Sequence, residues 1–116
     1  MIKKENRLRK RKQFNYLFKN GKGLGCEYFS LVYLPLKTKN FKVGYSVSKK
    51  VGKAVVRNKM KRRLKECVRS FSNEIKNEFY IIIVAKSKII ELEFVDMNEK
   101  LYKLFRKAGL LNENNC

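Results

Sequence analysis

The sequence of 116 residues has no histidine and no tryptophan, a single proline, and only 10 Asp and Glu residues against 29 Lys and Arg residues. Without histidine or clustered carboxylates, the chain lacks the usual general base and the acids that hold catalytic metal ions. Its few acids suit structural places, such as the first turn of the last predicted helix. We therefore predict no catalytic residue and no metal ligand in this chain.

Cysteine is also scarce, and Cys26, Cys67 and Cys116 lie far apart with no CxxC pair. A zinc finger or zinc knuckle therefore cannot be assembled. The N-terminal sequence MIKKENRLRKRK has no apolar segment after its charges, unlike a secretory signal. The longest apolar run, FYIIIVA at residues 79–85, is too short to span a bilayer. We expect a reducing, cytoplasmic setting with no disulfide and no membrane partner.

Positive charge is what the chain has in excess. The formal net charge is +19 and the pI is about 10.1, whereas solubility alone needs a net charge of roughly 2 to 8 on a small domain. Such a field attracts polyanions, above all nucleic acid. Hydrophobic residues make up 44% of the chain, which excludes a wholly disordered basic tail. We predict one nucleic-acid-binding domain over residues 1–116, with residues 1–12 as a mobile basic arm.

Two stretches in the first half of the chain predict β-strands. Residues 28–37 are rich in aromatic and β-branched side chains, and residues 41–48 alternate between apolar and polar positions. We expect them to pair as a hairpin, in which Gly44 can divide the second strand into two. The glycines of residues 21–25 precede a strand and do not follow one, so they lack the context of a phosphate-binding loop and predict a flexible connection.

Three further stretches predict helices, because their apolar residues recur at steps of three and four. These stretches are residues 13–20, 53–71 and 94–108. Residues 79–86 do not alternate, which is typical of a strand buried on both faces. The resulting order, α-β-β-(β)-α-β-α, predicts an α+β sandwich in which helices pack on a mostly antiparallel sheet.

The helix predicted at residues 53–71 has one apolar side and one cationic side. The segment GKAVVRNKMKRRLKE, residues 52–66, contains seven basic side chains and one carboxylate, Glu66. More lysines crowd the start of the helix, where each cation costs about 0.3 to 1 kcal/mol because the helix dipole favours anions. A bound phosphate would make these same positions favourable. The residues predicted to bind nucleic acid are Lys49, Lys50, Lys53, Arg57, Asn58, Lys59, Lys61, Arg62, Lys65 and Arg69. Asn58 can donate and accept hydrogen bonds, so its predicted role is to contact a sugar hydroxyl or to fix a neighbouring loop.

Aromatic residues are more numerous than a core of this size needs. We therefore expect some of Phe14, Phe18, Tyr28, Phe29 and Tyr33 to line a groove, where unpaired bases stack at roughly 1 to 3 kcal/mol each. Packing in the core is the alternative for any one of them.

The segment SVSKKVGKAVVRNKMKRRLKE, residues 46–66, resembles the signature of the bacterial ribonuclease P protein subunit. That family's pattern runs Ser-Lys-Lys, a Gly, Ala-Val, then Arg-Asn followed by Lys-Arg and a further basic residue. The likeness extends through NRLRKRKQFNYLFKNGK, YFSLVYL, YIIIVAK and LYKLFRKAG. Lys59 and Lys65 depart from it, standing where arginine is frequent, and so does Val32, where the family often has an aromatic residue.

The resemblance implies a subunit that helps an RNA enzyme remove the 5′ leader from precursor tRNA. In that family the RNA subunit is the catalyst and uses bound Mg²⁺, while the protein binds the RNA through its basic helix. A cleft between the first helix and the sheet holds the single-stranded leader, and the fold contains a left-handed βαβ crossover. The matching aromatic positions are Phe14, Phe18 and Phe29, to which we add Tyr33.

Two other functions fit the basic surface. A structural, ribosome-associated RNA-binding protein would use the same helix without handling a leader. A DNA-binding module would use residues 53–70 as a recognition helix, but such a helix normally offers several side chains to base edges, and Asn58 is the only amide on that face. We therefore expect RNA and not DNA as the partner.

Overall fold

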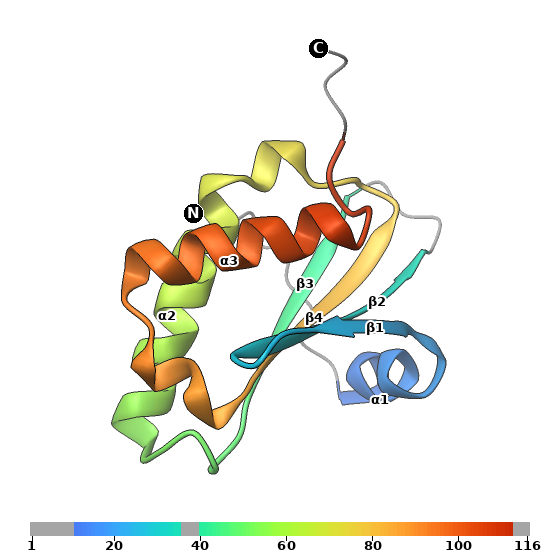
Figure 1. Cartoon of the computed structure of the whole chain (residues 1–116). Helices are drawn as coiled ribbons and strands as arrows, with labels where there is room; N and C mark the ends of the chain where they lie inside the picture. The colour runs from blue at the N-terminus through green and yellow to red at the C-terminus, as the bar shows by residue number, and fades with distance from the viewer. Residues whose placement is uncertain (1–10, 36–39, 113–116) are drawn as a thin grey trace.

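The computed structural model describes residues 11–35 and 40–112 (Figure 1). The order of helices and strands is the predicted α-β-β-β-α-β-α. Most of the predicted basic arm lies outside the described residues, and its last two residues, Arg11 and Lys12, begin the first helix. The elements are α1 (Arg11–Asn20), β1 (Lys22–Gly25), β2 (Phe29–Pro35), β3 (Lys42–Val47), α2 (Ala54–Ser70), η2 (Ser72–Glu74), β4 (Phe79–Ala85), η3 (Ser87–Glu91) and α3 (Phe94–Lys107).

The four strands form one sheet in the order β1-β2-β4-β3. β2 is antiparallel to both β1 and β4, whereas β3 is parallel to β4, so the sheet is mostly antiparallel, as predicted. The chain passes from β3 through α2 to β4, which makes a parallel β-α-β unit. The left-handed sense that the family resemblance implies for this crossover stays a prediction. Ile81, Ile82 and Ile83 are fully buried, and a strand that is apolar on both faces is suited to a place inside the sheet.

The predicted hairpin of residues 28–37 with residues 41–48 is wrong, because β4 lies between β2 and β3. The prediction relied on the tendency of consecutive strands to pair, which the doubly buried β4 overrides. The flexible connection predicted at residues 21–25 is also wrong, since β1 pairs with β2 from Lys22 opposite Tyr33 to Gly25 opposite Ser30. The third strand before α2 is β1, which the sequence analysis did not predict. The division of residues 41–48 at Gly44 is wrong, because β3 is continuous.

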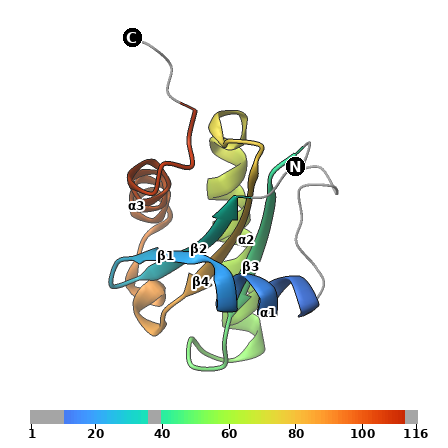
Figure 2. The ribbon, with the colours of Figure 1, turned by 90° about the vertical axis from the view of Figure 1, so that its right-hand side faces the viewer.

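The helices cover the two faces of the sheet unequally (Figure 2). α2 and α3 pack on one face, where the main core includes Leu31, Ile83, Leu64 and Phe105. α1 packs on the other face, where Leu17 and Ile82 are fully buried. No helix in the described ranges is both long enough and apolar enough to cross a membrane.

Candidate nucleic-acid interface

Helix α2 separates its apolar and cationic side chains as the sequence predicts. Met60, Leu64, Cys67 and Val68 are buried beneath it. The cationic face, together with the loop of residues 48–53 before the helix, carries all ten residues predicted to bind nucleic acid. Arg57 and Lys61 are partly buried. The other eight, which are exposed, are Lys49, Lys50, Lys53, Asn58, Lys59, Arg62, Lys65 and Arg69.

The N-terminus of α2 has no internal source of negative charge. Its N-cap residue is Lys53, no side chain caps the helix, and no acid lies in the first turn. The first backbone N–H groups of a helix have no partner within it and carry the positive end of the dipole. Three exposed lysines, Lys49, Lys50 and Lys53, stand at the same end. This combination is unfavourable alone and becomes favourable when an anion is present.

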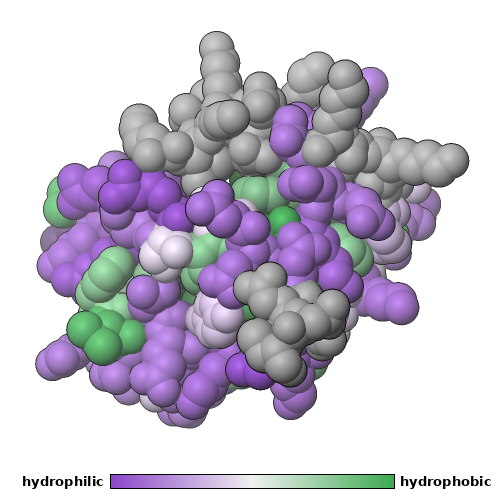
Figure 3. All heavy atoms as spheres, turned by 90° about the horizontal axis from the view of Figure 1, so that it is seen from above, coloured by the Kyte–Doolittle hydropathy of each residue, from purple (hydrophilic) through white to green (hydrophobic). Residues whose placement is uncertain are grey.

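The cations of α2 are largely unneutralised. In the part of the chain that the structure describes, the one ion pair that involves α2 joins Arg69 Nη2 to Glu66 Oε2 at 3.0 Å. Lys65 Nζ lies 5.8 Å from the centre of the Tyr45 ring, a cation–π distance. With one ion pair among so many cations, the cationic face of α2 is suited to a polyanion. Seen from above, the molecule is hydrophilic over most of its described surface, with small, separate hydrophobic patches (Figure 3).

A second surface, the α1 face, is formed by α1 and the side of the sheet on which it packs. Phe18 is 49% exposed and Tyr16 is 51% exposed, whereas Phe14 is half-buried against Leu17 and Ile82. Exposed aromatic rings held on a fixed framework can stack on unpaired bases. The structure thus brings two of the predicted aromatic residues, Phe14 and Phe18, to the α1 face.

The other two predicted cleft residues lie on the opposite side of the sheet. Phe29 is fully buried in the main core, and Tyr33 packs against the same core with its ring edge-on to Phe79 at 6.3 Å. Their placement with Phe14 and Phe18 is therefore wrong. The cause is the two-residue period of a strand, which puts both residues on the face that α2 and α3 cover.

Tyr80 on β4 is the aromatic residue that the sequence analysis missed on this surface. It packs with Val32, Leu34 and Ile82 in the small core beneath α1 and is half-buried. The alternation of β4 separates Tyr80 and Ile82 from Ile81, which faces the main core. The sequence shows this alternation, but it does not show which face of the sheet α1 covers, so it could not place Tyr80 on the α1 face.

The side chains that could act as a nucleophile or hold a metal ion are buried or far apart in the described residues. Burial, helped by the charge of Glu66, raises the pKa of the Cys67 thiol to about 12, so this residue is not a nucleophile at neutral pH. Within residues 11–35 and 40–112, no three His, Cys, Asp or Glu side chains gather in a way that could hold a metal ion.

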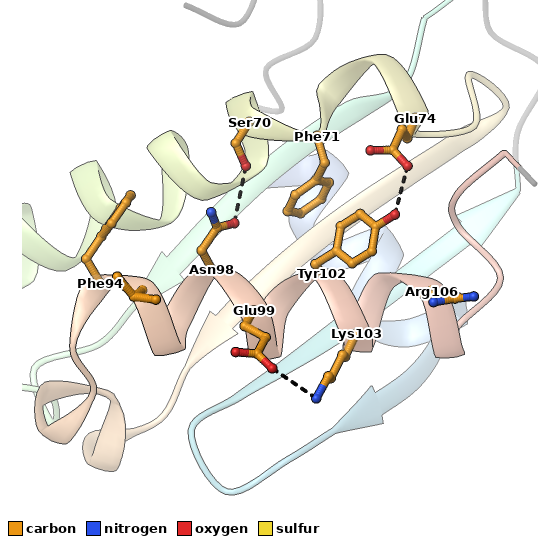
Figure 4. A pocket seen from close by; sticks show the side chains of 10 residues that line it. Ser70, Phe71, Glu74, Phe94, Asn98, Glu99, Tyr102, Lys103 and Arg106 are labelled. Atoms are coloured by element: carbon orange, nitrogen blue, oxygen red, sulfur yellow. Dashed lines mark hydrogen bonds and ion pairs between the residues drawn. The ribbon is translucent and has the colours of Figure 1, made fainter. Parts of the chain in front are cut away.

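A pocket of about 620 Å³ lies between α3 and the C-terminal end of α2 (Figure 4). Phe71 lines it and meets the ring of Tyr102 edge-on at 5.4 Å. Polar side chains along the pocket are engaged with one another: Ser70 Oγ with Asn98 Oδ1 at 3.2 Å, Tyr102 with Glu74 at 2.8 Å, and Lys103 with Glu99 at 3.2 Å. Glu74 therefore joins α3 to the segment after α2, whereas Glu99 pairs within α3 itself. The pocket is separate from the cationic face of α2.

Known proteins resemble this sequence over nearly the whole length of the chain. Residues 2–109 match the model of the Ribonuclease P family. The ribonuclease P protein component of Caldanaerobacter subterraneus subsp. tengcongensis is 35% identical over 113 residues, covering 97% of each chain. That of Thermoanaerobacter sp. (strain X514) is 38% identical over 114 residues, covering 98% of each.

Solved structures agree. The RNase P protein of Staphylococcus aureus superposes with a TM-score of 0.86 at 28% identity, covering 92% of this chain and 98% of that one. The RNase P protein of Thermotoga maritima gives a TM-score of 0.81 at 34% identity, covering 87% of this chain and 96% of that one. With its basic helix and this shared fold, the chain belongs to the bacterial ribonuclease P protein family, the protein subunits of the ribonucleoprotein that processes tRNA 5′ ends.

Proposed function

We propose that this chain holds two RNAs at once: the catalytic RNA subunit of ribonuclease P and the precursor tRNA. The observation that carries the proposal is the cationic face of α2, which has one internal ion pair and an N-terminus without an acidic cap. Lys and Arg on such a face neutralise phosphates and release counterions, which gives strong binding that depends on salt and not on base sequence. That is the kind of contact a large folded RNA needs.

The α1 face is the proposed site of the single-stranded 5′ leader. Its support is the exposure of Phe18 and Tyr16 beside the partly buried Phe14 and Tyr80. Stacking tolerates every base, because each base has a π face, so this surface can accept leaders of different sequence. In this proposal the cationic face of α2 binds the RNA subunit and the α1 face binds the substrate.

Cleavage itself is assigned to the RNA subunit, with Mg²⁺ held by that RNA and the substrate. Mg²⁺ prefers oxygen ligands such as phosphates in near-octahedral geometry, whereas the described residues gather no set of acids for it. This chain's part in the reaction is to bind and orient the two RNAs. A cytoplasmic location is part of the proposal, and a role in processing tRNA precursors supports it.

Reconstitution tests the proposal. The purified chain is added to a bacterial ribonuclease P RNA and a precursor tRNA at low Mg²⁺ concentration, and cleavage at the 5′ junction is measured. We expect the protein to rescue cleavage, with a preference for substrates that carry a leader. Lack of rescue with several different RNA subunits would overturn the proposal, as would correct cleavage by protein freed of all RNA.

The same materials separate the alternatives. A ribosome-associated RNA-binding protein predicts equal affinity for tRNA with and without its leader, while leader recognition predicts tighter binding of the precursor. Competition by duplex DNA at matched salt concentration tests the DNA-binding alternative.

A further inference from the structure

The loop between β3 and α2, residues 48–53, presents its lysines from a fixed turn. The backbone N–H of Lys50 donates to Ser48 Oγ at 3.3 Å, and that of Val51 donates to the Ser48 carbonyl at 3.1 Å. The side chain of Val51 is buried in the main core, at 4% exposure. Lys49 and Lys53 stay exposed on either side of this anchor. The loop therefore has a defined conformation although its lysines repel one another.

Gly52 lets the loop pass close to the first turn of α2. Its φ is +156°, and a Cβ at this position would lie 3.1 Å from two side-chain carbons of Val56. An L side chain rarely adopts this φ, and the contact is tighter than ordinary packing allows. Glycine at residue 52 is therefore part of what brings the lysines to the end of the helix.

Arg57 ties the loop to the helix from the other side. Its Nε donates to the carbonyl oxygen of Gly52 at 3.2 Å, in a partly buried contact. The other two guanidinium nitrogens, Nη1 and Nη2, make no hydrogen bond within the described part of the chain. A guanidinium has five donors in a planar fork, so one edge can hold the loop while another meets a phosphate. A lysine ammonium carries its three donors on one nitrogen, so it has no second edge from which to reach a separated phosphate.

We propose that Arg57 is a positioning residue: its Nε–H holds the Gly52 carbonyl and so keeps Lys49, Lys50 and Lys53 together at the N-terminus of α2. The inference rests on the proposed function, in which this surface binds RNA phosphates. It goes further by giving Arg57 a task that its charge alone does not supply. Without the hydrogen bond, mutual repulsion spreads the lysines and their joint contact with the phosphate backbone is lost.

The test measures how RNA affinity depends on salt for variants that keep the charge. Arg57→Lys leaves the net charge unchanged, and Gly52→Ala removes no charge but disturbs the same loop. Each phosphate contact contributes about 0.7 to 0.9 to the slope of log affinity against log salt concentration. We expect either substitution to lower that slope by about two, as three lysines disengage in part. The matched control, Arg106→Lys on α3, should keep the wild-type slope.

Two outcomes separate this inference from the proposed function. If the wild-type chain binds ribonuclease P RNA without any salt dependence, the proposed function fails and this inference fails with it. If the wild-type slope is steep and Arg57→Lys retains it, only the positioning role is overturned, because Arg57 then acts by charge alone. A wild-type slope in Gly52→Ala overturns it as well, since the position of the loop would then not matter.

Amide hydrogen exchange gives a readout that needs no RNA. In Arg57→Lys we expect the amides of Lys50 and Val51 to exchange faster than in the wild type, because the turn at Ser48 is no longer held against α2. Amides in β4 should keep their protection, which shows that the variant is folded. Unchanged protection at Lys50 and Val51 would overturn the positioning role.

Discussion

Tyr102 on α3 donates its hydroxyl to Glu74 Oε1 in η2 at 2.8 Å, and this hydrogen bond joins the last helix to the end of α2. The same contact, with desolvation and the charge of Glu74 adding to it, raises the pKa of the Tyr102 hydroxyl above 10.0. Tyr102 therefore keeps its proton, and with it this hydrogen bond, at neutral pH.

Tyr102→Phe is expected to lower the midpoint of thermal unfolding by a few degrees, because a hydrogen bond to a carboxylate is lost while the ring is retained. Because the pKa of Tyr102 is higher in the folded state than in the unfolded state, its contribution to stability is fully present below pH 10. This contribution is lost as the pH rises through the raised pKa. The difference between wild type and variant should therefore shrink in alkaline buffer. Tyr16→Phe is the control, and an equal loss there would contradict the prediction.

Phe29→Ala is expected to destabilise the fold by about 3 to 5 kcal/mol, because it removes a fully buried ring from the main core. Urea denaturation measures this change in the free energy of unfolding. Phe18→Ala, which removes an exposed ring, should cost less than about 1 kcal/mol. Equal losses from the two substitutions would contradict the placement of Phe29 in the core.

Phe18→Ala and Tyr80→Leu are each expected to weaken binding of a leader oligonucleotide by about 5- to 150-fold, the equivalent of one lost base stack. Tyr33→Leu, on the other side of the sheet, should leave leader affinity at the wild-type value. Fluorescence anisotropy with a labelled single strand measures all three, with thermal unfolding to confirm that each variant is folded. A larger loss from Tyr33→Leu than from Phe18→Ala would contradict the prediction, because the leader would then bind on the face of the sheet opposite α1.

Cys67 is expected to resist alkylation in the native protein. With a pKa of about 12, roughly one thiol in ten thousand is ionised at pH 8, and the side chain is fully buried. Cys26, which is partly exposed, should react much faster. Iodoacetamide labelling followed by peptide mass spectrometry gives both rates, and labelling in denaturant should abolish the difference. Equal native rates would mean that the core beneath α2 opens readily.

The cationic face of α2 could be predicted from the sequence because it depends on one helix alone. Helical periodicity puts Met60 and Leu64 on one side and Asn58, Arg62 and Lys65 on the other, whatever the helix packs against. Exposed charges also need no partner from elsewhere in the chain. Local information was sufficient for this surface.

The α1 face could not be predicted in the same way, because β2 is apolar on both sides. Alternation showed that Phe29 and Tyr33 share one side and Val32 the other, but it did not show which side α1 would cover. Strand order raised the same difficulty, since a hairpin and a sheet with β4 inserted satisfy the same local pattern. Both questions are decided by contacts between segments distant in sequence.

The inserted position of β4 also determines when the protein can fold during synthesis. β4, residues 79–85, pairs with both β2 and β3. A nascent chain that has left the ribosome only up to α2 therefore exposes the edges of β2 and β3 that β4 later covers, together with the apolar side of α2. A highly cationic helix is then available to ribosomal RNA before it has a core to rest on. Productive assembly with the proper RNA therefore depends on completion of the last third of the polypeptide.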